Sequence, residues 1–227
     1  MPAKNSIKYY LKNGYYHLYN RGVEKRDIFL DEQDYNVFLS YLKIYLLPKD
    51  LVQLNLTLSS QKSTPKQKDQ ALKLIKLKNF HKTIDLVCYA LMPNHFHLLV
   101  RQSQDDGIDH FLNALGTRYV GYFNRKYKRV GPLFQGVYKA VLVNSEEQLL
   151  HLSRYIHLNP LTINKPNLPS SLPEFLGRAE TDWLQPEIVL GYFSKTNPTN
   201  TYESFMKDYL DAEFITYLAI DMGDEVF

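Results

Sequence analysis

Two histidines separated by one residue are the first feature of the sequence that could do chemistry. His95 and His97 lie in an apolar run, HFHLLVRQ, whose composition is typical of a β-strand. Side chains alternate between the faces of a strand, so both imidazoles should project from one face while Phe96 points into the core. Two neutral imidazoles make half of a metal site, and a third ligand has to come from elsewhere. For the pair taken alone, the alternative is that both histidines have a structural role and bind no metal.

A second candidate lies on a predicted helix with the sequence LLHLSRYIHLNP. Tyr155 and Asn159 are four residues apart in it and should lie on one helical face. We expect Pro160 to end the helix and leave the Asn159 amide free to turn outward. A tyrosine hydroxyl, with a pKa of about 10, is a useful nucleophile only if its proton is removed or its target is activated. A cation that polarises a phosphate would provide such activation. The alternative is a half-buried ring and an ordinary helix cap.

Aromatic residues lie among basic ones in RYVGYFNRKYKR, from residue 118 to residue 129. This segment has no acidic residue, whereas the stretch from residue 208 to 227 is acidic. The net charge is only +3, so its distribution says more than its sum. Cations beside aromatic rings suit phosphates and unpaired bases, although a solvated helix face is the alternative. The candidate DNA-binding residues here are Arg118, Arg125, Lys126, Lys128 and Arg129.

The elements that must position these residues occur in the order β-α-β-β-α-β, followed by one more helix. This order predicts an α+β fold, a ferredoxin-like (RRM-like) sandwich with an antiparallel sheet. Pro93 and Asn94 alone separate the second and third strands, which predicts a hairpin with a tight turn. The predicted strands are 14–23, 83–93, 95–102 and 134–143, and the predicted helices are 31–47, 105–127 and 145–159.

Two segments fall outside this order. Residues 49–80 lose regular pattern around QKSTPKQKDQ, and we expect an insertion with a short helix at QALKLIKLKNF. After residue 163 comes a proline-rich stretch that we expect to be an extended linker, followed by helical segments over residues 182–193 and 201–219. The predicted organisation is therefore a catalytic domain over residues 1–163 and a linker with a small helical C-terminal extension over residues 164–227.

Composition narrows the class of protein. Of the 227 residues, 44% are hydrophobic and 22% are charged, which indicates a globular chain with one good core. The longest apolar run, near residues 86–92, is far too short to span a bilayer. The N-terminal residues lack the apolar core of a signal peptide, and the lone Cys88 cannot form an internal disulfide. We therefore expect a cytoplasmic protein with no membrane partner.

Four motifs, taken together, resemble the REP-associated tyrosine transposases, within the single-tyrosine His-hydrophobe-His (HUH) transposases of bacterial insertion sequences. The resemblance covers about residues 14–161 and implies a ferredoxin-like catalytic core. Carried over position by position, it implies His95 and His97 as metal ligands, Tyr155 as the nucleophile and Asn159 as a polar third ligand. The motifs, in chain order, are YHLYNRGVEKRDIF, YALMPNHFHLLV, YFNRKYKRVGPLFQGVYKAVLV and LSRYIHLNP.

The resemblance implies an enzyme that nicks and rejoins single-stranded DNA. Tyr155 would attack the scissile phosphate, forming a 5′-phosphotyrosine link and freeing a 3′-hydroxyl, with His151 as one candidate base. The implied cofactor is a divalent metal, Mg²⁺ or Mn²⁺, of which Mn²⁺ better suits two imidazoles and an amide. The implied partner is single-stranded or hairpin DNA, and the chain could be a monomer or a homodimer. Further candidates for gripping phosphates are Arg21, Lys25 and Arg26.

A second class of protein fits the same fold. A non-catalytic RNA- or DNA-binding module on an RRM-like sheet could stack bases on strand aromatics such as Tyr15 and Tyr19. That hypothesis gives no reason for the two histidines, Tyr155 and Asn159 to occur together. A zinc-dependent hydrolase is disfavoured because no acidic third ligand lies at a recognisable spacing.

Overall fold

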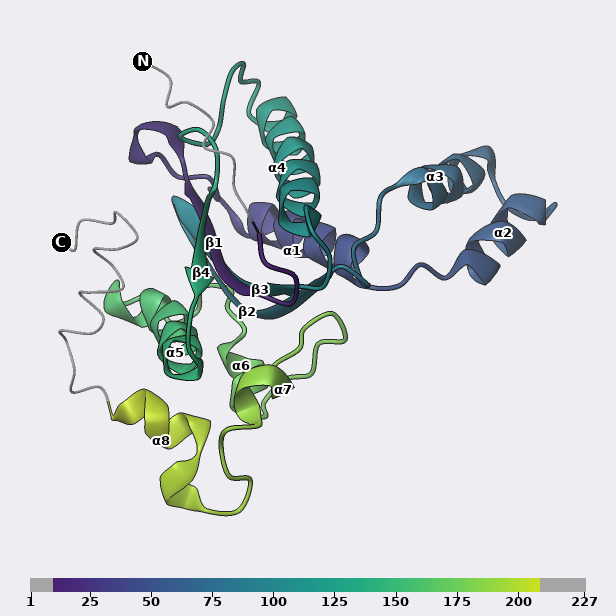
Figure 1. The fold of residues 1–227 in the computed structure, drawn as a ribbon. Helices are drawn as coiled ribbons and strands as arrows, with labels where there is room; N and C mark the ends of the chain where they lie inside the picture. The colour runs from purple at the N-terminus through teal and green to yellow at the C-terminus, as the bar shows by residue number, and fades with distance from the viewer. Residues whose placement is uncertain (1–9, 209–227) are drawn as a thin grey trace.

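A four-stranded antiparallel sheet in the order β2-β3-β1-β4 forms the centre of the computed structural model, which describes residues 10–208 (Figure 1). Antiparallel pairing joins β1 to β3 and β4, and β3 to β2. This order, together with the succession of elements along the chain, confirms the predicted ferredoxin-like fold. The strands are β1 (Tyr15–Arg21), β2 (Ile84–Met92), β3 (His95–Gln102) and β4 (Lys139–Val143).

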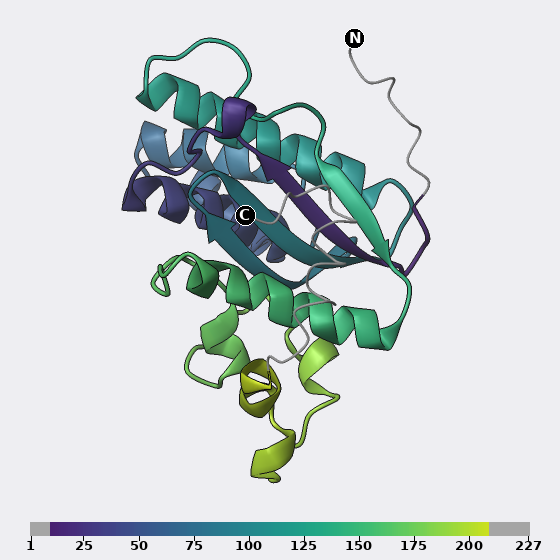
Figure 2. The same cartoon turned by 90° about the vertical axis from the view of Figure 1, so that its left-hand side faces the viewer.

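Helices cover both faces of the sheet (Figures 1 and 2). On one face, α1 (Glu32–Leu46) and α4 (Gly107–Lys126) pack on a large core that includes Leu18 and Leu98. On the other face, α5 (Glu146–Thr162) packs on a smaller core that includes Leu99. Because neighbouring strand residues point to opposite faces, β1 and β3 give apolar side chains to the α1–α4 face and turn their histidines toward α5.

The last turn of α5 differs from the prediction. The helix continues to Thr162, so the expectation that Pro160 ends it was wrong. Proline has no N–H to bond to the carbonyl one turn earlier, and the ring crowds that carbonyl. In the same turn, the side chain of Asn159 donates to the carbonyl of Tyr155 at 2.8 Å, and the Lys165 N–H donates to the Pro160 carbonyl at 2.9 Å. Asn159 therefore lies inside the last turn rather than at a free end.

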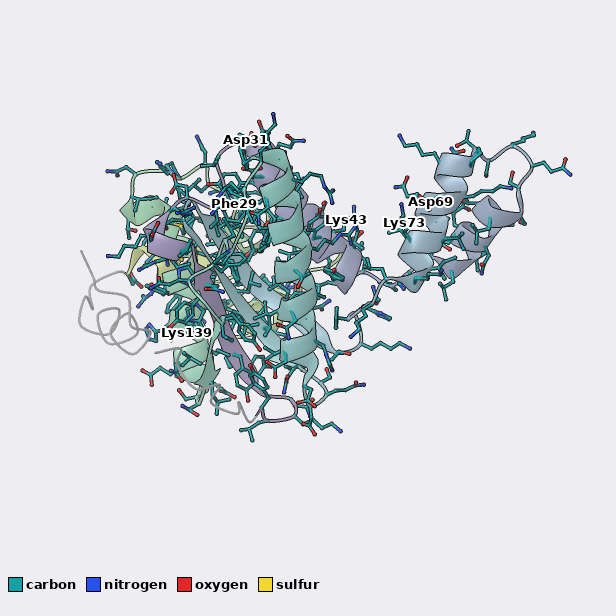
Figure 3. The ribbon with its side chains drawn as sticks, turned by 90° about the horizontal axis from the view of Figure 1, so that it is seen from above. Phe29, Asp31, Lys43, Asp69, Lys73 and Lys139 are labelled. Atoms are coloured by element: carbon teal, nitrogen blue, oxygen red, sulfur yellow. The ribbon has the colours of Figure 1, made fainter. Side chains whose placement is uncertain are left out.

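Residues 51–76 form two helices, α2 (Leu51–Ser59) and α3 (Pro65–Lys76), that project from the body as an arm (Figures 1 and 3). The short helix predicted over residues 70–80 is present within α3, which begins earlier, at Pro65, whereas α2 was not predicted. The local signal is a capping box between Thr64 and Gln67, with Pro65 at the first helical position. Ala71 is the one buried residue among those of the arm.

The chain after α5 runs along the free edge of β2 rather than forming a loose linker. The amide of Leu91 donates to the Pro169 carbonyl at 2.9 Å, and the amide of Ser171 donates to the Tyr89 carbonyl at 3.0 Å. Such cover protects an edge strand from pairing with another chain. Short helices follow: α6 (Leu172–Phe175), α7 (Glu187–Leu190) and α8 (Tyr202–Lys207), with 3₁₀ turns at Val23–Lys25 (η1) and Pro198–Asn200 (η2).

The helix predicted over residues 201–219 is present as α8, and its part beyond residue 208 lies outside the described residues. Among residues 10–208, none of the helices has the length and apolar character needed to cross a membrane.

Candidate active site

Aromatic rings from β1, β3 and α5 meet on the face of the sheet that α5 covers. The ring of Tyr155 lies 5.7 Å from that of His97, centroid to centroid, and His97 lies 4.8 Å from His95. On the neighbouring strand, His17 stacks on His97 at 5.0 Å and on Tyr19 at 4.9 Å. The structure thus brings together the two predicted histidines and the predicted nucleophile, and it adds His17, which sequence analysis missed.

The histidines are engaged through one ring nitrogen each. His97 Nδ1 lies 2.9 Å from His17 Nε2, and His95 Nδ1 lies 2.6 Å from Asn94 Oδ1. The other nitrogen of His97, Nε2, is buried and has no hydrogen-bond partner within the described part of the chain. Buried polar atoms are nearly always satisfied, so an orphaned imidazole nitrogen is a reason to expect a missing ligand. A cation at Nε2 fits this arrangement.

Burial keeps these imidazoles neutral. It lowers the pKa of His95 to about 3, with the nearby Arg21 charge as a second cause. It also lowers the pKa of His17 to about 3, where His95 contributes, and holds the pKa of His97 well below its usual value. A neutral imidazole keeps one ring nitrogen with a lone pair, which is the form that binds metal ions.

The described residues contain no group of three or more His, Cys, Asp or Glu side chains that could hold a metal. A third ligand to a cation at His95 and His97 would therefore come from another kind of group, such as an amide, water or an oxygen of the substrate. Asn159 uses its Nδ2 to bond to the Tyr155 carbonyl, which leaves Oδ1 as its ligating atom. Asn159 as a ligand stays a prediction, as do the roles of His95, His97 and Tyr155.

Two basic residues share the face that holds Tyr155. Arg21 ends β1 opposite His95, and Lys139 begins β4 opposite Tyr19. Directly opposed residues in an antiparallel pair project to the same face, so both cations lie on the face that holds the histidines. Lys139 is exposed and was not among the predicted residues, because only the register of β4 against β1 shows which way it points. Figure 3 shows Lys139 on the side of the body away from the arm.

The other predicted DNA contacts near β1 lie in the turn that follows it. Lys25 is exposed in η1, and Arg26 pairs with Glu24 at 2.8 Å while keeping more than a third of its side chain exposed at 38%. Both stay predictions.

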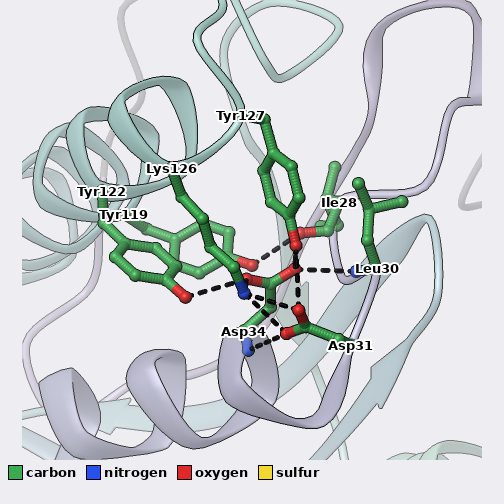
Figure 4. Close-up of polar contacts among 8 residues, drawn as sticks. All are labelled: Ile28, Leu30, Asp31, Asp34, Tyr119, Tyr122, Lys126 and Tyr127. Atoms are coloured by element: carbon green, nitrogen blue, oxygen red, sulfur yellow. Dashed lines mark hydrogen bonds and ion pairs between the residues drawn. The ribbon is translucent and has the colours of Figure 1, made fainter.

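Most of the predicted basic run contacts the protein itself, on the α4 side of the sheet. The guanidinium of Arg118 lies 4.4 Å from the ring centroid of Tyr41. The ammonium of Lys126 pairs with Asp31 and Asp34 at 2.7 and 2.8 Å (Figure 4). Arg129 lies over the ring of Phe123 and donates to the Pro132 carbonyl at 3.4 Å. Arg125 and Lys128 are exposed. DNA binding by the run stays a prediction.

Two further histidines of α5 face the C-terminal extension. His157 is buried, with Nδ1 2.7 Å from the Tyr202 hydroxyl and Nε2 2.8 Å from Ser171 Oγ. The Nδ1 of His151 accepts a hydrogen bond from Arg154 at 2.8 Å, and the His151 ring contacts Phe205. These contacts tie α5 to the extension, and His151 as a base for Tyr155 stays a prediction.

Comparison with known proteins finds a transposase family model that matches part of the chain. Residues 59–159 match the family model described as "Transposase IS200 like", which confirms the family resemblance of the motifs. No curated protein matches the sequence.

Two solved structures are distantly similar. The first is of a REP-associated tyrosine transposase bound to a REP hairpin, at 13% identity, TM-score 0.48, and coverage of 80% of this chain and 94% of that one. The second is a putative transposase from Deinococcus radiodurans R1, at 15% identity, TM-score 0.35, and coverage of 69% and 95%.

Proposed function

Because residues 59–159 have the sequence pattern of the IS200-like transposases, we propose that this chain cuts and rejoins single-stranded DNA with Tyr155 as the nucleophile. The main support is the contact between Tyr155 and His97, with ring centroids 5.7 Å apart. It puts a hydroxyl-bearing side chain beside a pair of neutral imidazoles on one face of the sheet.

His95 and His97 would hold a divalent cation through their Nε2 atoms, with Asn159 Oδ1 as third ligand. When bound, the cation would supply positive charge that makes the phosphate more open to attack. α5 runs toward the end of the sheet where His95 lies, since residue 169, just beyond the helix, bonds to Leu91. Four helical residues rise about 6 Å, close to the roughly 6.7 Å between alternate strand residues. Asn159 is therefore expected level with His95 when Tyr155 is level with His97.

The proposed step forms one bond and breaks one bond at phosphorus. The Tyr155 oxygen attacks the scissile phosphate, and its proton passes to a base or to water. The P–O3′ bond breaks, the 3′-oxygen takes up a proton, and the 5′-phosphate remains linked to Tyr155. Attack by another 3′-hydroxyl reverses the step and joins a new strand, so no nucleotide cofactor is needed. Arg21 and Lys139 would neutralise phosphates next to the one attacked, in single-stranded or hairpin DNA.

The cover of the sheet disfavours the non-catalytic alternative. An RRM-like module stacks bases on an open sheet face. Here α5 packs over the face that holds Tyr15 and Tyr19, and only 8% of Tyr19 is exposed. Stacking of bases on that surface would require α5 to leave.

Replacing Tyr155 with Phe tests the proposal. The variant keeps the ring that packs against His97 but lacks the attacking oxygen, so a covalent protein–DNA adduct should disappear from a denaturing gel. Affinity for the same oligonucleotide should change less than about twofold. Tyr122→Phe, on α4 and hydrogen-bonded to Asp34 at 2.9 Å, is the control and should still form the adduct. An adduct formed by Tyr155→Phe would show that another residue is the nucleophile.

A further inference from the structure

We propose that Asn94 and His17 are positioning residues that hold His95 and His97 as Nδ1–H tautomers, so that the Nε2 lone pairs are free to bind a cation. The inference rests on the metal site of the proposed function. Ligating histidines usually donate their second ring N–H to a neighbour, which fixes the tautomer and the ring orientation. In this chain the two neighbours are an amide in the β2–β3 turn and an imidazole on β1.

The hydrogen bonds of Asn94 fix which way its amide points. Its Nδ2 lies 3.2 Å from the carbonyl of Lys25, which can only accept, so the atom at that position must be the amide nitrogen. Oδ1 then faces His95 Nδ1 at 2.6 Å, and because Oδ1 can only accept, His95 must carry its proton on Nδ1. The Nε2 atom of a neutral His95 is left with a lone pair.

The turn that holds Asn94 is itself anchored to the loop after β1. The Gly22 N–H donates to the Asn94 carbonyl at 2.8 Å, and the amides of Ile28 and Phe29 donate to the Pro93 carbonyl at 2.7 and 3.0 Å. Gly22 has to be glycine for this contact, because an added Cβ would lie 2.1 Å from the Arg26 carbonyl oxygen. Asn94 is thus held on both sides and can orient His95 without moving.

The buried pair His17–His97 allows two proton arrangements, and only one suits a cation. If His17 Nε2–H donates to His97 Nδ1, the orphaned Nε2 of His97 carries a proton and cannot bind metal. If His97 Nδ1–H donates to His17 Nε2, the Nε2 of His97 has the lone pair, and His17 carries its proton on Nδ1. The described residues offer no partner to either outer nitrogen, so a cation at His97 Nε2 would select the second arrangement.

Histidine tautomers can be read in the metal-free protein by long-range ¹H–¹⁵N NMR. We expect an Nδ1–H signature for His95 in the parent chain, whereas His17 and His97 can take either arrangement until a cation binds. Asn94→Ala should release His95 toward the Nε2–H form that free neutral imidazole prefers, and His17→Phe, which removes the acceptor for His97 Nδ1–H, should leave His97 in the Nε2–H form. Asn94→Asp should keep the Nδ1–H form of His95, and His17→Gln retains an acceptor for His97 Nδ1–H.

Affinity for Mn²⁺, measured by calorimetry without DNA, provides the second readout. Asn94→Ala and His17→Phe should each weaken binding by about 10- to 100-fold, the usual effect of losing such a partner, while Asn94→Asp and His17→Gln should recover most of it. The matched control is Asn79, whose Oδ1 lies 2.6 Å from His81 Nδ1 in the loop before β2. Asn79→Ala removes the same kind of bond at the other end of the hairpin and should leave Mn²⁺ affinity unchanged.

The outcomes distinguish the metal site at His95 and His97 from the positioning roles of Asn94 and His17. An Nε2–H tautomer for His95 in the parent, or unchanged Mn²⁺ affinity in Asn94→Ala and His17→Phe, would overturn the positioning roles alone. A parent chain that binds no Mn²⁺ would overturn the metal site and the positioning roles with it. Dispersed NMR spectra confirm folding of each variant, and if His17→Phe fails to fold, the Asn94 variants decide the proposal.

Discussion

The Lys126 ammonium reaches from the last turn of α4 to two carboxylates at the start of α1 (Figure 4). One of them, Asp34, is fully buried and also accepts hydrogen bonds from the hydroxyls of Tyr122 and Tyr127. Burial alone would raise the pKa of Asp34, but the Lys126 ammonium and the other donors outweigh it and hold the pKa below its usual value. Asp34 is therefore charged at neutral pH and depends on Lys126.

Replacing Lys126 with Met should lower the free energy of unfolding at neutral pH. A buried carboxylate that loses its cation costs about 3–5 kcal/mol, and the part-exposed ammonium reduces this to about 2 kcal/mol. Urea unfolding measures the loss, and Arg125→Met, an exposed neighbour, should change stability by less than about 0.5 kcal/mol.

The dependence of stability on acid pH follows from the direction of the Asp34 pKa shift. A carboxylate whose folded-state pKa is depressed stabilises the fold above its unfolded pKa of about 4 and loses that contribution as the pH falls. The parent chain and Lys126→Met should therefore converge in stability on acidification. Equal stability at neutral pH, or a gap that persists in acid, would show that the pair contributes nothing to the fold.

At the scale of single residues, the alternation of side chains along one strand was enough to predict that His95 and His97 share a face. His17 and Lys139 could not be found in the same way, because they join the site only through the register of β1 against β3 and β4. Register depends on contacts between residues far apart in the chain, and no local pattern contains it. The ion pair of Lys126 was hidden for the same reason.

Among the elements, the arm formed by residues 51–76 is closed at its base by hydrogen bonds. The Lys49 ammonium bonds to the carbonyls of Ile75 and Leu77, and the Asn79 amide donates to the Leu47 carbonyl at 2.6 Å. The amide of Phe80 donates to the Tyr45 carbonyl at 2.7 Å. The two chain segments that enter and leave the arm are thus already side by side.

Replacing residues 51–76 with a short Gly-Ser linker should leave the rest of the chain folded. Ala71 is the one buried residue among residues 51–76, so removing the arm takes little apolar contact from the core. Thermal unfolding should stay within about 5 °C of the parent, and a short single-stranded oligonucleotide should still form the adduct. A variant truncated after residue 164 is the contrast: it uncovers the β2 edge and the α5 face and should unfold. Failure of the arm-less chain to fold would show that the arm supports the core.

The main elements were predictable because each has a strong local pattern: alternation for the strands, helical spacing for α1 and α4. In the arm, α2 was missed and α3 was predicted only in part, because neither helix buries an apolar face against the core and the capping residues are the clearest local signal. The prediction that Pro160 ends α5 was wrong because one missing N–H does not end a helix whose apolar face is buried. Leu152 and Ile156 are buried on that face.

For the whole molecule, the sheet separates two sets of basic residues. Arg21 and Lys139 lie on the α5 face with Tyr155, whereas Arg125 and Lys128 lie at the end of α4, the helix on the other face of the sheet. Figure 2 shows helices on both sides of the sheet. Both sets are near the same end of the sheet, since Lys126 contacts Asp31 just after the turn that follows β1. Single-stranded DNA bound at Tyr155 would reach Arg21 and Lys139 directly. Only a longer DNA, such as a hairpin with a stem, would extend around the end of the sheet to Arg125 and Lys128.

This separation predicts different salt dependences for two double variants. Arg21→Ala with Lys139→Ala should weaken binding of a short single strand and flatten its salt dependence, by a slope of about 0.7 for each lost phosphate contact. Arg125→Ala with Lys128→Ala should leave that strand unaffected and weaken only a hairpin with a stem, which can extend past the end of the sheet. Fluorescence anisotropy over a salt series measures both. Lys66→Ala with Lys76→Ala removes the same charge from the exposed arm and serves as the control for net charge. If the Arg125–Lys128 variant flattens the slope for the short strand, the DNA crosses the α4 face, and Tyr155 would then be too far from its path to be the nucleophile.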